Sequence, residues 1–219
     1  LLQFISESGD KGCCVNSLAQ QSELSAYAVG VLVDMGLSMG LLYLNEDAYV
    51  LDKIGHFLLH DDMAKTNLNF THDVCYQGLF ELEASLKEGK PKGLSSLGDW
   101  PTIYPGLSQL PDEIKKSWFE FDHYYSDHAF ESLLPLIFQA KPKHIVDVGG
   151  NTGKWALACT GYDSQVQITI MDLPGQLQVA MENAVNAGVS DRVNAYVTDL
   201  LDENKPFCEK GDLYWMSQF

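Results

Sequence analysis

The chain has 219 residues, of which 46% are hydrophobic and 20% charged, values that exclude extended disorder and collagen-like repeats. Thirty acidic residues against fourteen basic ones give a formal charge of −16, and Arg192 is the only arginine, which argues against nucleic acid and anionic membrane surfaces as partners. No apolar run reaches the roughly 20 residues that span a membrane, and the five cysteines form no C-x-x-C pair, so we expect a cytoplasmic protein with reduced thiols.

The first 36 residues predict three helices. The first begins with the chain and ends at Gly9, a C-cap candidate. The second starts at 17–20, which has capping-box spacing, and the third is capped by Ser25 and closed by Gly36. The apolar positions assigned to this third helix are Tyr27, Val31 and Met35.

Residues 41–44 and 48–51 are short apolar runs around a polar turn, which predicts a hairpin. Three helices followed by a hairpin is the winged helix-turn-helix order. A DNA reader needs basic side chains on its recognition helix and wing, yet 25–36 contains no Lys or Arg, and residues 1–62 hold nine acids against two lysines. Protein–protein contact, namely dimerisation, is therefore the favoured role, with a transcription factor as the alternative.

The middle of the chain links this unit to the next. Residues 63–85 are helical in pattern and complete a first domain of residues 1–85. Residues 86–111 are rich in Gly and Pro, and 112–140 predicts one long helix, so 86–140 is read as a connector and linking helix. One face of that helix carries Phe121, Tyr125, Ala129, Leu133 and Leu136.

After Pro142, apolar strands alternate with helices, which predicts a parallel, doubly wound sheet over 141–219. The expected strands are 144–149, 165–172, 193–199 and 212–219, and the expected helices 155–161 and 177–187. The sequence opens inside a helical pattern and closes inside an apolar strand. Since an unpaired apolar strand favours aggregation, we expect the sequence to be a segment of a longer protein.

Residues 147–153 read Asp-Val-Gly-Gly-Asn-Thr-Gly and lie between a predicted strand and a predicted helix, where open α/β sheets bind ligands. A P-loop is excluded because Lys154 is followed by Trp155. A dinucleotide loop is excluded because Asn151 and Lys154 occupy two of its glycine positions.

The remaining pattern, an acid followed by glycines at alternate positions, resembles motif I of the class I S-adenosylmethionine-dependent methyltransferases. Asp147 is the acid, and Gly149, Asn151 and Gly153 are the alternate positions. The cofactor has an amino-acid tail and no phosphate, so the loop must let backbone approach closely, and the acid can accept from the ammonium group. Asn151 replaces a glycine, and asparagine tolerates the left-handed backbone.

The same resemblance gives roles to two further strand ends. Asp172 ends the second predicted strand, where a carboxylate receives the two ribose hydroxyls, and Leu173 covers one face of the adenine. Asp199 ends the third strand and accepts from the adenine amino group, with Leu200 beside the ring. Three acids at the carboxyl ends of three successive strands together indicate a cofactor site.

The whole chain is similar to small-molecule O-methyltransferases that carry an N-terminal winged-helix dimerisation domain. The matching stretches are 18–20, 145–150, 171–174 and 198–200. The resemblance implies an α/β chain: a mainly helical winged-helix domain, then a Rossmann-like methyltransferase domain cut after its fourth strand. It also implies a homodimer that uses S-adenosyl-L-methionine, releases S-adenosyl-L-homocysteine, and methylates a small hydroxylated, aromatic or polyketide-like molecule.

The resemblance also implies a cavity beside Ser126-Asp-His128, with Tyr125 in its wall. Two positions depart from the family: Ala129 where Ser is frequent, and Ser217 where Lys is frequent. The family's histidine base follows the fourth strand and would lie beyond Phe219. If no base follows, the alternative is a cofactor-binding homologue that acts as a regulator or scaffold.

The histidines of this sequence are weaker candidates for a catalytic base or a metal ligand. His123 and Asp127 are four apart on the long helix, the spacing of an oriented imidazole, and His128 lies on a different face. Packing or capping is the preferred role for both histidines. His56 and His60 have the spacing of a zinc-protease pair but lack its glutamate, so no metal site is predicted.

Overall fold

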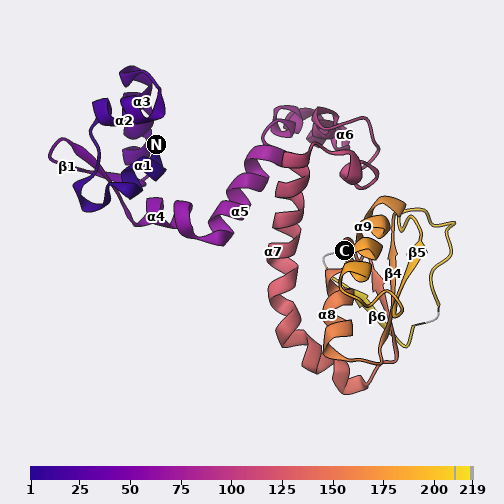
Figure 1. The fold of residues 1–219 in the computed structure, drawn as a ribbon. Helices are drawn as coiled ribbons and strands as arrows, with labels where there is room; N and C mark the ends of the chain where they lie inside the picture. The colour runs from indigo at the N-terminus through magenta and orange to yellow at the C-terminus, as the bar shows by residue number, and fades with distance from the viewer. Residues whose placement is uncertain (210, 218–219) are drawn as a thin grey trace. The chain divides into compact units, whose positions relative to one another are not determined.

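The structure is a computed structural model that describes residues 1–209 and 211–217. The chain forms two compact units, Leu1–Asn69 and Phe70–Phe219, which are described separately (Figure 1). The sequence placed the first boundary at residue 85. Residues just after 69 instead pack on the long helix: Phe70 stacks on Phe121 at 4.1 Å between ring centroids, and Ser117 donates to Asp73.

The first unit has the predicted order of three helices and a hairpin. Its core joins the three helices to the hairpin through Ile5, Leu18, Val29, Val33, Leu42 and Leu51. The strands pair antiparallel with Leu42 opposite Leu51. The elements are α1 (Leu2–Glu7), a 3-10 turn (Gly9–Lys11), α2 (Val15–Ser22), α3 (Ala26–Ser38), β1 (Leu42–Asn45), β2 (Ala48–Leu51), α4 (Lys53–His60) and α5 (Asp62–Phe70).

Local signals in this unit were partly misleading. Ser25 caps α3 as predicted, with its hydroxyl 3.1 Å from the N–H of Ala28. The capping box at Ser17 is wrong, because α2 begins at Val15 and Ser17 lies inside the helix. Gly36 does not close α3 either: a Cβ there would lie 2.8 Å from Leu42 Cδ1, so glycine lets the helix approach the hairpin.

The buried face of α3 also differs from the predicted one. Val29 and Val33 are buried, whereas Tyr27 is 83% exposed and Val31 and Met35 are exposed as well. Both sets of residues have helical spacing, so periodicity alone could not say which one faces the core. Within the described structure, the apolar residues chosen from the sequence form an outward face of the first unit.

The second unit begins with short turns and one long helix. The turns are a π-turn (Thr71–Cys75) and 3-10 turns (Gly78–Glu81, Lys92–Ser96 and Tyr104–Gln109) around α6 (Leu82–Glu88). Helix α7 (Asp112–Ile137) matches the predicted long helix, carries Pro135 in its last turns and is followed by a 3-10 turn (Phe138–Ala140).

A four-stranded sheet forms the rest of this unit. Its strands are all parallel in the order β5-β4-β3-β6, with α8 (Lys154–Tyr162) following β3 and α9 (Pro174–Asn186) following β4. The strands are β3 (His144–Val148), β4 (Gln167–Asp172), β5 (Val193–Val197) and β6 (Leu213–Met216). The predicted mixed α/β chain with a parallel sheet is therefore confirmed.

The two faces of the sheet are covered differently. Ile145, Ile168 and Ile170 pack under α8 and α9, with residues of α7 added at the edge. On the opposite face, Val146 and Met171 pack under the loop residue Cys208. In the described ranges no helix covers that second face, so only one helical layer of the expected doubly wound sheet is seen. No described helix is long and apolar enough to cross a membrane.

Candidate functional site

The loop after β3 has left-handed backbone at alternate positions. Gly149, Asn151 and Gly153 have φ of 69°, 51° and 79°. The left-handed backbone at the middle position agrees with the expectation that asparagine is tolerated there. Gly150 has a different constraint, since a Cβ there would lie 2.5 Å from Asp147 Oδ2.

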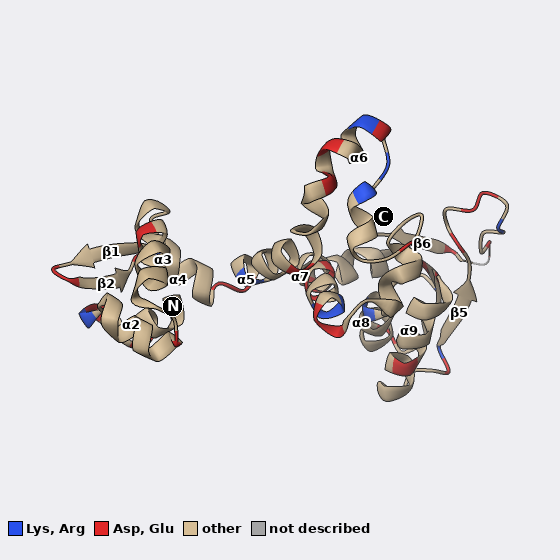
Figure 2. Cartoon of the chain, turned by 90° about the horizontal axis from the view of Figure 1, so that it is seen from above, with Lys and Arg blue, Asp and Glu red and all other residues tan. Residues whose placement is uncertain are grey.

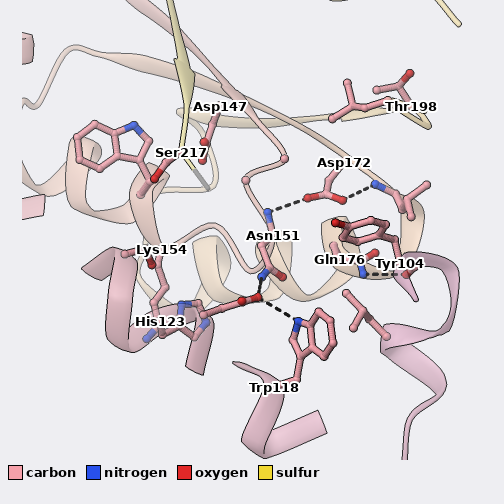
Figure 3. A pocket seen from close by; sticks show the side chains of 18 of the residues that line it. Tyr104, Trp118, His123, Asp147, Asn151, Lys154, Asp172, Gln176, Thr198 and Ser217 are labelled. Carbon is pink, nitrogen blue, oxygen red and sulfur yellow. Dashed lines mark hydrogen bonds between the residues drawn. The ribbon is translucent and has the colours of Figure 1, made fainter. Parts of the chain in front are cut away.

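Hydrogen bonds join the loop to the end of the neighbouring strand β4. The N–H of Gly149 donates to the carbonyl of Met171 at 2.8 Å. The Asp172 carboxylate accepts from the N–H of Asn151 at 2.8 Å through Oδ2 and from the N–H of Leu173 at 2.7 Å through Oδ1 (Figure 3). Each carboxylate oxygen can accept a second hydrogen bond, so Asp172 keeps capacity for two ligand hydroxyls.

Asp147 is a buried carboxyl at the base of the loop. The residue is 2% exposed, and its Oδ2 has no hydrogen-bond partner among the described residues. Burial, with a smaller effect from the negative charge of Asp172, raises the pKa of Asp147 to about 7. A positively charged ligand nearby would favour the ionised form and lower that pKa.

A cavity of about 520 Å³ opens over these strand ends, a volume suited to a small-molecule ligand. Seven of the residues predicted from the sequence line it: Asp147, Gly149, Asn151, Asp172, Leu173, Asp199 and Leu200. The cavity therefore brings the three strand-end acids together. Asp199 is exposed and accepts from the N–H of Leu201 at 3.0 Å.

Three other candidates lie outside this lining. Gly153 is the N-cap of α8, and a Cβ there would lie 3.1 Å from Ile170 and Ala180 side chains. Tyr125, predicted as a wall residue, packs on Phe121 and Tyr124 instead. His128 is exposed, with Nδ1 2.5 Å from the Tyr124 carbonyl oxygen.

The face of α7 that lines the cavity is shifted by one residue from the apolar face that the sequence indicated. Trp118, Asp122, Ser126 and Phe130 line the cavity at intervals of four. The same periodicity could have identified this face, because 122, 126 and 130 directly follow the predicted 121, 125 and 129. Asp122 Oδ2 accepts from Trp118 Nε1 at 3.1 Å and from Asn151 Nδ2 at 3.4 Å, and burial raises the pKa of Asp122.

His123 also lines the cavity, in a network with the start of α8. Its Nε2 lies 3.1 Å from Thr152 Oγ1, and its Nδ1 lies 3.4 Å from Asp127 Oδ1. Burial, followed by the charge of Lys154, lowers the pKa of His123. Both ring nitrogens are engaged, which suits the packing role predicted for this histidine. The expected family base would lie beyond Phe219, outside the described residues.

His56 and His60 stack at 6.0 Å between ring centroids in the first unit. His60 Nε2 lies 3.3 Å from Ser6 Oγ. Among the described residues, no group of three or more His, Cys, Asp or Glu side chains could hold a metal ion.

No protein-family model matches the chain. The L-tyrosine C(3)-methyltransferase of Streptomyces lavendulae is 21% identical over 187 residues, which cover 84% of this chain and 51% of that protein. The bacteriochlorophyllide d C-20 methyltransferase of Chlorobaculum tepidum is 27% identical over 117 residues, or 52% of this chain and 35% of that protein. The chain thus spans about half, or less, of the curated relatives it matches.

Solved structures with a similar fold include two O-methyltransferases. NcsB1, from neocarzinostatin biosynthesis, superposes with a TM-score of 0.68 at 22% identity, over 92% of this chain and 62% of NcsB1. The mitomycin 7-O-methyltransferase MmcR gives 0.65 at 16% identity, over 92% of this chain and 59% of MmcR. At these identities the likeness shows the fold alone.

Proposed function

We propose that the protein is an S-adenosylmethionine-dependent methyltransferase that methylates a hydroxyl group of a small molecule. The observation that carries this proposal is the Asp172 carboxylate, which is fixed by two backbone N–H groups beside a loop with alternating left-handed residues. The methyltransferase names of both curated relatives support it. So does NcsB1, whose solved structure contains S-adenosylmethionine.

The residues around the cavity fit the parts of this cofactor. Asp172 would hold the ribose hydroxyls through its remaining lone pairs. Leu173, Asp199 and Leu200 would surround the adenine. Asp147, a cavity-lining carboxyl with no partner for Oδ2 among the described residues, would face the positive end of the amino-acid tail.

When bound, S-adenosylmethionine supplies a methyl group on a positively charged sulfur. Trp118, Phe130 and Trp215 give the cavity apolar walls that displace water from the reacting groups. The aspartates that line the cavity, Asp122 and Asp147 among them, favour a cationic ligand, because its positive charge stabilises their ionised form. The chain's own contribution is therefore binding, orientation and exclusion of water, with the proton acceptor expected beyond Phe219.

The acceptor that we propose is a small hydroxylated molecule, aromatic or polyketide-like, methylated on oxygen. NcsB1 was solved with 2-hydroxy-5-methyl naphthoic acid, a molecule of this kind. Both curated relatives are named for methylation of carbon, so the atom that receives the methyl group needs a direct test. Carbon-13 NMR of the product made with labelled cofactor separates the two: an O-methyl signal is expected, and a C-methyl signal would overturn the choice of oxygen.

We further propose that the first unit is a winged-helix domain that dimerises. Its order of three helices and a hairpin supports the first part, and the exposed apolar residues Tyr27, Val31 and Met35 on α3 support the second. DNA reading remains the weaker alternative, because α3 carries no Lys or Arg and the hairpin tip carries Glu46 and Asp47 (Figure 2).

Isothermal titration calorimetry with S-adenosylhomocysteine tests the cofactor assignment. The full-length protein is expected to bind in the micromolar range, and Asp172→Ala is expected to weaken binding by about 100-fold because two charge-assisted hydrogen bonds are lost. Asp191→Ala, the same change at an exposed position of this unit, is the matched control. Absence of binding to the wild type would refute the proposal. Binding without methyl transfer to any acceptor would favour the regulator or scaffold instead.

A further inference from the structure

The cavity has a marked imbalance of charge. Five aspartates line it: Asp122, Asp127, Asp147, Asp172 and Asp199. Among the described lining residues, Lys154 is the one Lys or Arg. The chain's arginine, Arg192, points elsewhere and donates to the carbonyls of Asp163 and Thr160. Any carboxylate that enters this cavity therefore depends on Lys154 for a positive partner.

His123 cannot replace Lys154 as that partner. Burial lowers the pKa of His123, and the nearby positive charge of Lys154 lowers it further, so both effects disfavour the charged imidazolium. Its two nitrogens also already face Thr152 and Asp127. Figure 3 shows His123 and Lys154 on the same side of the cavity, away from Asp172.

Lys154 forms one ion pair and keeps N–H donors for a ligand. It is the first residue of α8, directly after the left-handed N-cap Gly153, so it stands at the positive end of a nine-residue helix. Its Nζ lies 2.7 Å from Asp127 Oδ2, and its side chain is 46% exposed. An ammonium group has three N–H donors, so the ion pair with Asp127 leaves two for a ligand. Asp127 in turn accepts from Ser126 Oγ at 2.9 Å.

We propose that Lys154 binds the carboxylate of the cofactor's amino-acid tail, with Asp127 as the residue that positions the lysine. The inference rests on the function proposed above. The tail carries an ammonium and a carboxylate; the aspartates suit the ammonium but repel the carboxylate, and Lys154 offsets that repulsion. The lysine that directly follows the glycine loop thus contacts the carboxylate of the amino-acid tail.

Two ligands that differ in the tail separate this role from a structural one. S-adenosylhomocysteine has the amino-acid tail, and 5′-methylthioadenosine lacks it. Calorimetry on the full-length protein is expected to show that Lys154→Gln weakens S-adenosylhomocysteine binding about tenfold or more, the usual scale for a charge-assisted hydrogen bond. The affinity for 5′-methylthioadenosine is expected to stay the same. Lys154→Arg, which keeps the charge, should recover most of the loss.

The matched control is Lys116→Gln on α7, which removes an exposed lysine paired with Glu120 outside the cavity. It should change neither affinity. An equal loss for both ligands in Lys154→Gln would mean that the lysine only supports the loop, and no loss for either would exclude a contact; both results overturn the inference while leaving the cofactor assignment intact. A wild type that binds neither ligand would overturn the proposed function itself.

Discussion

The backbone N–H of Asn151 donates a 2.8 Å hydrogen bond to Oδ2 of Asp172, which joins the loop after β3 to the end of β4. The other oxygen of the same carboxylate accepts from Leu173. One side chain therefore shapes the loop and also presents the lone pairs proposed for the ribose. Substitution of Asp172 must affect stability as well as binding, and the two effects have to be measured separately.

We expect Asp172→Ala to lower the free energy of unfolding by about 1–3 kcal/mol, because two backbone donors lose their acceptor. Urea denaturation of the ligand-free protein measures this directly. Asp191→Ala is the control and should stay within about 0.5 kcal/mol of wild type. If Asp172→Ala unfolds with the same free energy as wild type, water satisfies the two backbone N–H groups as well as the carboxylate does.

The raised pKa of Asp147 predicts that the protein loses stability as the pH rises. The ordinary value of this carboxyl is 3.8 and the folded value is about 7, so the folded state holds the proton more tightly than the unfolded chain. The destabilisation grows between these two values and is complete above about pH 7, where it reaches at most about 4 kcal/mol.

Asp147→Asn removes this titrating group and keeps the shape. Unfolding measured across this range should show a smaller fall in stability for Asp147→Asn than for wild type, and a more stable variant at about pH 8. The two curves should converge below about pH 3, where the wild-type carboxyl is protonated in both states. Parallel curves would show that Asp147 has an ordinary pKa.

The left-handed conformation of Asn151 predicts different stabilities for two small substitutions. Its φ is 51°, so Asn151→Ala places an ordinary residue in a strained region at a cost of about 1–2 kcal/mol. Asn151→Gly also removes the side chain that reaches Asp122, but it relieves the backbone. The glycine variant should therefore be the more stable of the two in thermal unfolding, and equal stabilities would argue against the left-handed backbone.

Two glycines within α3 form a matched pair. A Cβ at Gly36 would lie 2.8 Å from Leu42 Cδ1, whereas a Cβ at Gly30 would meet nothing within 4 Å. Gly36→Ala is expected to lower the free energy of unfolding by about 1–3 kcal/mol through overpacking. Gly30→Ala is expected to raise it by about 0.5–1 kcal/mol through helix propensity. Destabilisation by both would indicate that a partner also covers Gly30.

The proposed dimer predicts that charge on the outer face of α3 separates the subunits. Val31→Asp combined with Met35→Asp should convert a dimer to a monomer in light scattering coupled to size-exclusion chromatography, because both side chains are exposed in the single chain. Val185→Asp, at an apolar position on α9 that is more exposed than either of these, is the control. A wild-type protein that is monomeric at micromolar concentration would contradict the proposal.

The features that the sequence predicted correctly depend on neighbouring residues. The left-handed backbone tolerated at Asn151 depends on that residue's own sterics, and the N-cap at Ser25 depends on one side chain and the backbone three residues away. Alternating strands and helices predicted the parallel sheet. Parallel strands end at one edge, so the meeting of Asp147, Asp172 and Asp199 could be foreseen as well.

Other features depend on packing between distant segments, which periodicity does not specify. Both faces of α3 have helical spacing, and the hairpin, through Leu42 against Gly36, decides which one is buried. On α7 the family resemblance placed Tyr125 in the cavity wall, whereas Trp118 and Asp122 line the cavity. The pairing of Lys154 with Asp127 joins residues 27 positions apart. Only the docking of α7 against α8 brings them together, because electrostatic partners are fixed by distance in space rather than by spacing along the chain.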